Sequence, residues 1–217
     1  MALDLSSLTK EDGEFLVRLA RRAVERYLEE LVRIEPPPGY PPRLAERAGV
    51  FVTIERIGRD LSGRPRRMLR GCIGYPEPTH PLVEATIDAA IAAATEDPRF
   101  EPMTPGELDS VVFEVSVLSP PQPVQYSRPE ELLERVKVGR DGIIVERGLL
   151  RGLLLPQVPV EYEWGVEEYL SNACVKAGLP ADAWRTMRLK VYTFTARIFA
   201  EVYPRGEVVE RILEVGG

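Results

Sequence analysis

Two stretches of the chain show the same order of sequence patterns, and this order restricts the folds that the chain can adopt. In each stretch, an apolar segment that begins with glycine precedes a Leu-Arg-Gly word, a helical pattern and then a strand pattern. The matching words are Gly-Val-Phe-Val at 49–52 with Gly-Ile-Ile-Val at 142–145, and Leu-Arg-Gly at 69–71 with Leu-Arg-Gly at 150–152. The glycine words and the Leu-Arg-Gly words are not equally spaced, so chance recurrence of a three-residue word is the alternative. We predict two β-β-α-β units, at residues 49–120 and 142–203.

The spacing of apolar residues predicts the individual elements. Helices are expected near 10–33, 83–94 and 166–177, and strands near 50–57, 68–73, 111–117 and 190–201. In the strand at 111–117, Glu114 and Ser116 alternate with apolar residues, which predicts one buried and one exposed face. The sequence therefore predicts an α+β fold, an antiparallel sheet with flanking helices and a small appended lobe. We expect a single domain over residues 1–217, with an N-terminal helix in 1–35 and the two repeats as sub-lobes.

Composition restricts where such a chain works. Its apolar runs are too short to cross a bilayer, so we expect no membrane association and a cytoplasmic location. Two cysteines cannot form a disulfide framework, and free thiols are the expectation in a reducing compartment. Arginine supplies 24 of the 28 basic residues, whereas Asn and Gln together number four. This usage is compatible with the ion-paired surface of a heat-adapted protein.

The charge of the chain disfavours a nucleic-acid partner. The net charge is −6, although six arginines lie close together in the sequence: Arg56, Arg59, Arg64, Arg66, Arg67 and Arg70. No aromatic residue lies between them, and Ser62-Gly63 near their centre predicts a hairpin tip. A solvated hairpin is therefore favoured over a groove for phosphates.

The segment Leu-Arg-Gly-Cys-Ile-Gly at 69–74 contains one of the two cysteines. In a regular strand Arg70 and Cys72 would share a face, and a neighbouring cation would favour the thiolate of Cys72. His80, the single histidine, is a candidate base, and a residue at the start of the following helix is the other interpretation. Packing of a small apolar residue, ligand binding and covalent catalysis remain three hypotheses for Cys72. Cys174 lies on the apolar face of a predicted helix and is assigned to the core.

Other candidate site residues are acids, an amide and an arginine near the ends of elements. Asp97 and Arg99 lie on a loop after a predicted helix, and Gln157 and Glu161 follow a predicted strand. Ordinary surface ion pairs are the alternative interpretation. Two cysteines and one histidine cannot supply the ligands of a zinc site of that type, so we expect no metal. Neither a phosphate-binding Gly-rich motif nor a Gly-x-Ser-x-Gly nucleophile elbow is present.

Five segments in order resemble the AMMECR-type domain family, which is named for a human chromosomal region linked to Alport syndrome, midface hypoplasia and elliptocytosis. The segments are LRGCIGYPEP, AATEDPRFEPMTPGEL, FEVSVLSPP, RGLLLPQVPVEYEW and CVKAGL, and the resemblance spans about residues 10–203. It implies an α+β domain with an antiparallel sheet and a smaller lobe. It implies no defined activity, because the family has only a suggested basic cellular role near transcription, repair or translation. In microbes the family is associated with Memo-type and radical SAM proteins, which implies protein partners.

By residue, the resemblance marks eight positions as site residues: Arg70, Gly71, Cys72, Gly74, Asp97, Arg99, Gln157 and Glu161. We expect six of them to converge on one concave surface: Arg70, Cys72, Asp97, Arg99, Gln157 and Glu161. Two functions remain. The first is a binding or accessory module with an Arg/Cys cleft that works with protein partners, and it is favoured because the residues do not supply a complete set of acid, base and nucleophile. The alternative is an enzyme component in which Cys72 and its Arg and acid neighbours act on a small molecule; any cofactor is unknown.

Overall fold

The computed structural model describes residues 2–59, 63 and 65–213, and within them the chain forms two compact units. Unit 1 comprises the described residues up to Pro120 together with Arg197–Arg211, and unit 2 comprises Pro121–Ala196 together with Ile212 and Leu213. Helices and antiparallel sheets occur in both units, which confirms the α+β prediction. Ser62 and Arg64, expected near the hairpin tip, lie outside the described residues.

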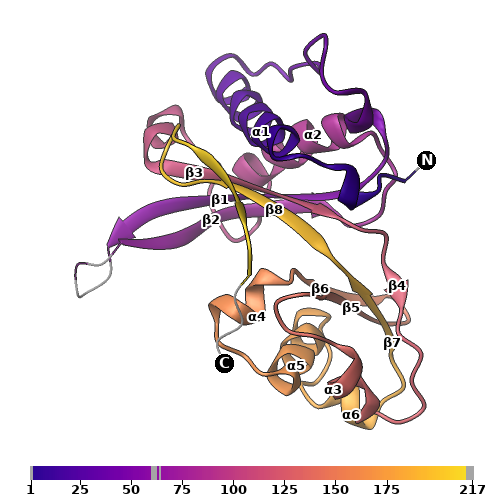
Figure 1. Ribbon diagram of the computed structural model, residues 1–217. Coiled ribbons are helices and arrows are strands. Elements are labelled where there is room, and N and C mark those ends of the chain that lie inside the picture. The colour runs from indigo at the N-terminus through magenta and orange to yellow at the C-terminus, as the bar shows by residue number, and fades with distance from the viewer. Residues whose placement is uncertain (1, 60–62, 64, 214–217) are drawn as a thin grey trace. The chain divides into compact units, whose positions relative to one another are not determined.

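Unit 1 is a five-stranded sheet with two long helices on one face (Figure 1). Its strands follow the order β2-β1-β3-β8-β9. The strands are β1 (Gly49–Arg59), β2 (Pro65–Tyr75), β3 (Val111–Leu118), β8 (Ala196–Glu201) and β9 (Val208–Arg211). The helices are α1 (Lys10–Glu30) and α2 (Leu82–Thr95), with 3₁₀ helices η1 (Leu5–Ser7), η2 (Pro42–Ala45) and η3 (Pro105–Ser110).

The ends of α1 follow local chemistry. Thr9 and Asp12 form a capping box, in which the Thr9 hydroxyl accepts from the Asp12 amide and the Asp12 carboxylate accepts from the Thr9 amide. The helix ends at Glu30 because Leu31 takes a left-handed conformation with φ of 56°. It therefore stops before residue 33 and before the proline run.

A buried ion pair fixes α1 to the sheet. Arg21 donates from Nε and Nη2 to the two carboxylate oxygens of Glu201 at 2.7 and 2.6 Å. The remaining Nη1 donates to the Leu108 carbonyl, and the guanidinium lies 4.7 Å from the centre of the Phe113 ring. The Phe113 amide also donates to Glu201. Because each charge is hydrogen-bonded as well as paired, the pair fits in the core.

Unit 2 is a four-stranded sheet in the order β4-β7-β5-β6, with short helices. The strands are β4 (Gln122–Pro123), β5 (Gly142–Arg147), β6 (Leu150–Leu154) and β7 (Lys190–Phe194). The helices are α3 (Glu131–Arg135), α4 (Gln157–Glu161), α5 (Val166–Lys176) and α6 (Ala183–Thr186). Tyr169 and Cys174 of α5 are fully buried in the core of this unit, as the sequence predicts for Cys174.

The predicted repeat has the same strand order in both units. In unit 1 the first strand of the hairpin pairs with both others, in the order β2-β1-β3, and in unit 2 the order is β6-β5-β7. A helix connects the second and third strands in each, α2 and α5 respectively. We align Gly71 with Gly152 because each lies against the helix that follows its hairpin. Gly71 lies opposite Ile54 and Gly152 opposite Val145, so these two residues are then aligned as well. With this alignment Gly142 takes the position of Phe51, two residues from Gly49, so the glycine words and the Leu-Arg-Gly words are not aligned at the same time.

A glycine allows the helix to approach the sheet in each unit. A Cβ on Gly71 would lie 2.0 Å from the Ala93 carbonyl oxygen of α2, and one on Gly152 would lie 2.5 Å from the Ala173 oxygen of α5. Real Cβ atoms do not approach backbone this closely, so both positions require glycine. The Leu-Arg-Gly word thus marks one packing device that occurs twice.

Two strand predictions were wrong. Every residue of β3 is buried, including Glu114 and Ser116, so this strand has no exposed face. Glu114 is accommodated because Arg211 of β9 forms an ion pair with it. The predicted strand at 190–201 is interrupted at Thr195, so that β7 belongs to the sheet of unit 2 and β8 to the sheet of unit 1.

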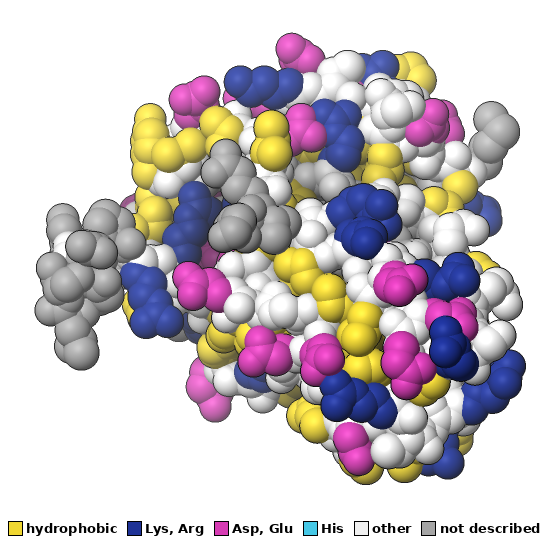
Figure 2. All heavy atoms as spheres, turned by 60° about the horizontal axis from the view of Figure 1, so that its bottom comes forward, with side chains coloured by type: hydrophobic (Ala, Val, Ile, Leu, Met, Phe, Trp, Pro, Cys, Tyr) yellow, Lys and Arg dark blue, Asp and Glu magenta, His cyan; other side chains and the backbone are white. Residues whose placement is uncertain are grey.

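The surface carries charges of both signs. Figure 2 shows basic and acidic side chains interspersed over the face that it presents, with hydrophobic side chains in small groups between them. Arginine–carboxylate pairs such as Arg33 with Asp88, at 2.6 Å, are common among them. This pattern agrees with the arginine-rich composition. In the part of the chain that is described, no helix has both the length and the hydropathy that a membrane span requires.

Candidate functional site

The Arg70–Cys72 segment lies on β2, at the edge of the five-stranded sheet. Ile54 of β1 lies opposite Gly71, but the next residue, Glu55, lies opposite Leu69. Arg70 is therefore the extra residue of a β-bulge. A bulge interrupts the alternation of side chains and redirects them, so the expectation that Arg70 and Cys72 share a face of a regular strand was wrong.

Arg70 is held by an acid and an aromatic ring. Its Nε and Nη2 donate to the two carboxylate oxygens of Glu107, at 2.8 and 3.1 Å, and its guanidinium lies 5.8 Å from the centre of the Phe100 ring. Arg56 donates to the same carboxylate at 2.5 Å. The hydrogen bond from Arg70 is the main cause that lowers the pKa of Glu107, from 4.5 to about 2, against the opposing effect of burial. The Arg70 guanidinium is therefore paired with the Glu107 carboxylate.

Cys72 is hydrogen-bonded through its backbone and its sulfur. Its amide donates to Asp97 Oδ2 at 2.8 Å, and its carbonyl accepts from Arg99 Nη2 at 3.4 Å. The Thr53 hydroxyl lies 3.3 Å from Sγ and donates to it. The thiol is half-buried and is not in a disulfide. Since β2 is an edge strand, Asp97 and Arg99 satisfy backbone groups that would otherwise be open to another strand.

Asp97 is only 4% exposed and is the centre of a cluster of contacting residues. We call this cluster the clamp: Thr53, Arg70, Cys72, Asp97, Arg99, Phe100 and Glu107. Besides the Cys72 amide, Asp97 accepts from the Arg99 amide at 3.1 Å and from the Arg99 guanidinium at 2.9 and 2.6 Å. Burial would raise the pKa of Asp97, but the hydrogen bonds from Arg99 and from the two backbone amides outweigh it and lower the pKa from 3.8 to about 2. A carboxylate with this pKa is a poor general base near neutral pH.

The two signature glycines have backbone reasons to be glycine. Gly71 faces α2, as described above. A Cβ on Gly74 would lie 2.2 Å from the Val50 carbonyl oxygen of the neighbouring strand. Packing therefore accounts for both residues, and a role in ligand binding stays a prediction.

Gln157 and Glu161 lie at the two ends of α4 in unit 2. Gln157 is buried and directly follows Pro156, and Glu161 is exposed. Arg70, Cys72, Asp97 and Arg99 come together in unit 1 through the contacts given above. The convergence of all the predicted residues on one surface stays a prediction, because they are divided between the two units.

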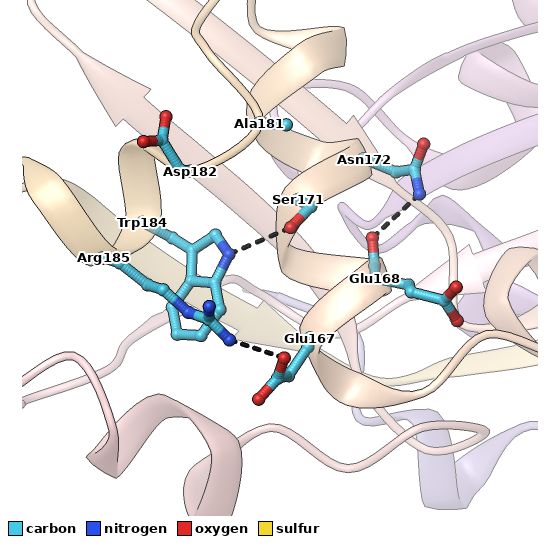
Figure 3. Close-up of a pocket in the computed structure, with 8 residues that line it drawn as sticks. All are labelled: Glu167, Glu168, Ser171, Asn172, Ala181, Asp182, Trp184 and Arg185. Carbon is cyan, nitrogen blue, oxygen red and sulfur yellow. Dashed lines mark hydrogen bonds and ion pairs between the residues drawn. The ribbon is translucent and has the colours of Figure 1, made fainter.

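Other candidate groups lie apart from this clamp. His80 is exposed, and its Nδ1 lies 2.9 Å from the Thr79 hydroxyl, two residues before α2 begins. Burial raises the pKa of the Cys174 thiol. Within residues 2–59, 63 and 65–213 no group of three or more His, Cys, Asp or Glu side chains is placed to hold a metal ion. A cavity of about 290 Å³ in unit 2 is lined by α5, α6 and the loop between them, and none of the predicted site residues lines it (Figure 3).

Sequence reasoning missed three residues of the clamp: Thr53, Phe100 and Glu107. Glu107 had a recognisable signal, because Thr104-Pro-Gly-Glu107 has the spacing of a capping box, and the structure contains that box at the start of η3. Thr53 and Phe100 carry no local signal. Thr53 meets Cys72 only through the register of β1 and β2, and Phe100 meets Arg70 only because the loop after α2 folds over the bulge.

Comparison with known proteins shows close similarity over almost the whole chain. The family model described as AMMECR1 matches residues 17–199. A protein of Thermofilum pendens is 66% identical over 212 residues, which are 97% of this chain and 100% of that protein. A protein of Thermococcus gammatolerans is 58% identical over 198 residues, 91% of this chain and 94% of that one. The crystal structure of the uncharacterised protein PH0010 from Pyrococcus horikoshii is similar with a TM-score of 0.89 and 54% identity, and the match covers 95% of this chain and 99% of that chain.

Proposed function

Because the chain belongs to the AMMECR1 family, we propose that it is a binding or accessory module for protein partners, with the Arg70–Cys72 segment of β2 at its binding surface. The observation that carries this proposal is the state of the two acids beside the segment. Asp97 and Glu107 both have a pKa of about 2; Asp97 accepts hydrogen bonds from Cys72 and Arg99, and Glu107 accepts them from Arg70. They fix a surface in place and are poorly suited to transfer protons near neutral pH.

The side chains next to the clamp suit protein contact. Met68 and Leu69 precede the bulge on the edge strand and are 44% and 40% exposed. Beyond Arg56 of β1 and its partner Val111, the β1–β2 hairpin continues without pairing to β3. An edge strand with exposed apolar side chains is a common place for a partner to dock. By family association, the partners that we propose are Memo-type or radical SAM proteins, in the cytoplasm. A small molecule at the Arg/Cys segment is compatible with this role.

A second candidate is an enzyme component that uses Cys72, and one observation favours it. The hydroxyl of Thr53 donates to Sγ at 3.3 Å, and a hydrogen bond to sulfur stabilises the thiolate over the thiol. Cys72→Ser separates the two candidates. If the chain is a binding module, Cys72→Ser should bind the partner with the affinity of the wild type. If Cys72 is the nucleophile of an enzyme, Cys72→Ser should lose the turnover of the substrate.

The binding proposal is tested by placing a charge on the exposed surface. The dissociation constants of a purified Memo-type and a purified radical SAM protein from the same organism are measured for the wild type, Leu69→Glu and Leu150→Glu. Leu150 is the leucine of the Leu-Arg-Gly word on β6 in unit 2 and is 44% exposed, so it is a control of the same residue type and similar exposure. We expect Leu69→Glu to weaken binding about tenfold or more, because a buried unpaired charge costs at least about 1.4 kcal/mol. The proposed surface would be contradicted if the wild type binds and both variants lose the same amount of affinity. It would also be contradicted if Leu69→Glu binds as tightly as the wild type.

A further inference from the structure

Two aromatic side chains of unit 2 form an exposed stacked pair directly after α4. The rings of Tyr162 and Trp164 are nearly parallel, with an interplanar angle of 21° and centroids 4.9 Å apart. Trp164 packs against the core of unit 2, whereas Tyr162 is 66% exposed. The indole therefore supports the phenol ring and leaves much of the Tyr162 ring open to solvent. We call Tyr162, Glu163 and Trp164 the aromatic platform.

The backbone of the aromatic platform is fixed by the end of α4. The Trp164 amide donates to the Pro159 carbonyl at 2.8 Å, and the Glu163 amide donates to the Val160 carbonyl at 3.2 Å. This is the hydrogen-bond pattern of a Schellman motif. The motif places its C′ residue in the left-handed region, and that residue is usually glycine. Here that residue is Glu163, with φ of 55°. A glutamate therefore occupies a position where glycine would relieve backbone strain.

The aromatic platform lies in an acidic segment. Residues 161–168 contain four glutamates and no Lys or Arg: Glu161, Glu163, Glu167 and Glu168. Glu167 is paired with Arg185, and Glu168 accepts from the Gly165 amide. Within the described residues the Glu163 carboxylate has neither a hydrogen bond nor an ion pair, and it lies between the two stacked residues in the chain. The residue that follows the open Tyr162 ring in the chain therefore carries a negative charge.

The same unit contains the chemistry that would complement this surface. Arg185 lies with its guanidinium 4.5 Å from the centre of the Trp184 ring and donates to the Glu167 carboxylate at 2.5 Å (Figure 3). A planar cation can therefore stack on an aromatic ring and pair with a nearby acid at once. Guanidinium does this better than ammonium, because it is flat and less strongly hydrated.

We propose that the aromatic platform binds an arginine-bearing segment of a partner protein, with the guanidinium stacked on Tyr162 and paired with Glu163. The aromatic platform lies in unit 2 and shares no residue with the Arg70–Cys72 surface of unit 1. The inference therefore does not rest on the function proposed above, and each can fail without the other.

The test uses the full chain and a hexapeptide of alternating arginine and glycine, with the matching lysine–glycine and glutamate–glycine peptides for comparison. The chain has two tryptophans, and Trp184 is only 2% exposed, so a change in emission on titration reports on Trp164. We expect the arginine peptide to bind more tightly than the lysine peptide, and the glutamate peptide not to bind. Tyr162→Ala should weaken arginine-peptide binding about two- to fivefold, the range of an exposed cation–π contact. Glu163→Gln should weaken it by up to about fivefold, the range of an exposed ion pair.

Glu29→Gln is the matched control for charge. Glu29 is exposed on α1 in unit 1, and its replacement by Gln removes the same charge without changing the aromatic platform. We expect it to leave the affinity unchanged. An equal loss in Glu29→Gln and Glu163→Gln would mean that the acidic chain attracts any polycation, and it would overturn the proposal.

Glu163→Gly separates binding from folding. Glycine at a left-handed position should raise the unfolding midpoint, as should Leu31→Gly at the end of α1, where φ is 56°. Of these two variants, only Glu163→Gly should lower the affinity for the arginine peptide. Unchanged affinity in Glu163→Gly, or the absence of any binding to the wild type, would refute the inference.

Discussion

Replacement of Asp97 by asparagine should destabilise unit 1 in a manner that depends on pH. The substitution preserves the shape of the side chain but removes the charge that Arg99 and the Cys72 amide hold. The pKa of Asp97 falls from 3.8 to about 2 on folding, and at about 1.36 kcal/mol for each pKa unit this corresponds to about 2 kcal/mol of stability. Asp97 is only 4% exposed, but its partner Arg99 is half-exposed, so solvent screening makes about 2 kcal/mol an upper value.

The direction of the pH dependence follows from the lowered pKa. A carboxyl group that binds its proton less readily when folded stabilises the native state above its unfolded pKa, and loses this effect as the pH falls through 3.8 towards 2. Guanidinium denaturation at pH 7, 5, 3 and 2 should show a difference in the free energy of unfolding between wild type and Asp97→Asn of up to about 2 kcal/mol at the two higher pH values. The difference should shrink at pH 3 and further at pH 2. Asp88→Asn removes an exposed partner of Arg33 and should cost less than about 1 kcal/mol. A loss for Asp97→Asn that is absent at pH 7, or that is equal at pH 7 and pH 2, would refute the clamp.

Two further predictions concern the core. Glu201→Gln should lower the free energy of unfolding by about 3–5 kcal/mol, because it leaves the buried Arg21 charge without its bidentate partner. Denaturant unfolding measures this loss, and Glu210→Gln, which breaks the half-exposed pair with Arg197, is the comparison. A loss in Glu201→Gln no greater than that in Glu210→Gln would show that burial of the pair does not matter. Gly71→Ala and Gly152→Ala should each cost at least about 1–3 kcal/mol, because the new Cβ would meet a helix carbonyl; thermal melting of both variants checks this, with Gly106→Ala, where a Cβ meets nothing within 4 Å, as the neutral comparison.

Local periodicity was sufficient to predict most elements of the fold. The apolar patterns placed β1 and α2 within a few residues of their ends, because a strand alternates with period two and a helix with period 3.6. The repeated Leu-Arg-Gly word predicted the common strand order because Gly71 and Gly152 meet the same requirement for close helix packing.

The errors came from contacts that are distant in the sequence. Glu114 looked like an exposed strand residue, and its burial depends on Arg211, 97 residues further along the chain. The strand pattern at 190–201 continues through Thr195 because the chain stays extended while it passes from one sheet to the other. Alternation alone does not identify the sheet to which a residue belongs.

The candidate site was predicted in its membership more than in its chemistry. The loop residues Asp97 and Arg99 were assigned to the same site as Cys72, and they contact its backbone. The bulge at Arg70 could not be predicted, because it arises from the pairing of β1 with β2, and it decides which acid the guanidinium meets. That Gln157 and Glu161 lie at the same site as Cys72 is still a prediction.

The alkylation rate of Cys72 tests most directly whether the Arg70–Cys72 segment is a binding surface or a nucleophilic site. Iodoacetamide labelling near neutral pH, followed by peptide mapping, reads Cys72 and the buried Cys174 separately in the wild type and in Arg70→Met. Because Glu107 holds the Arg70 guanidinium, we expect Cys72 to label at a rate that Arg70→Met leaves unchanged, with Cys174 silent until the chain unfolds. Rapid labelling of Cys72 that Arg70→Met slows several-fold would show that the arginine activates the thiol, and would contradict a binding module in favour of an enzyme.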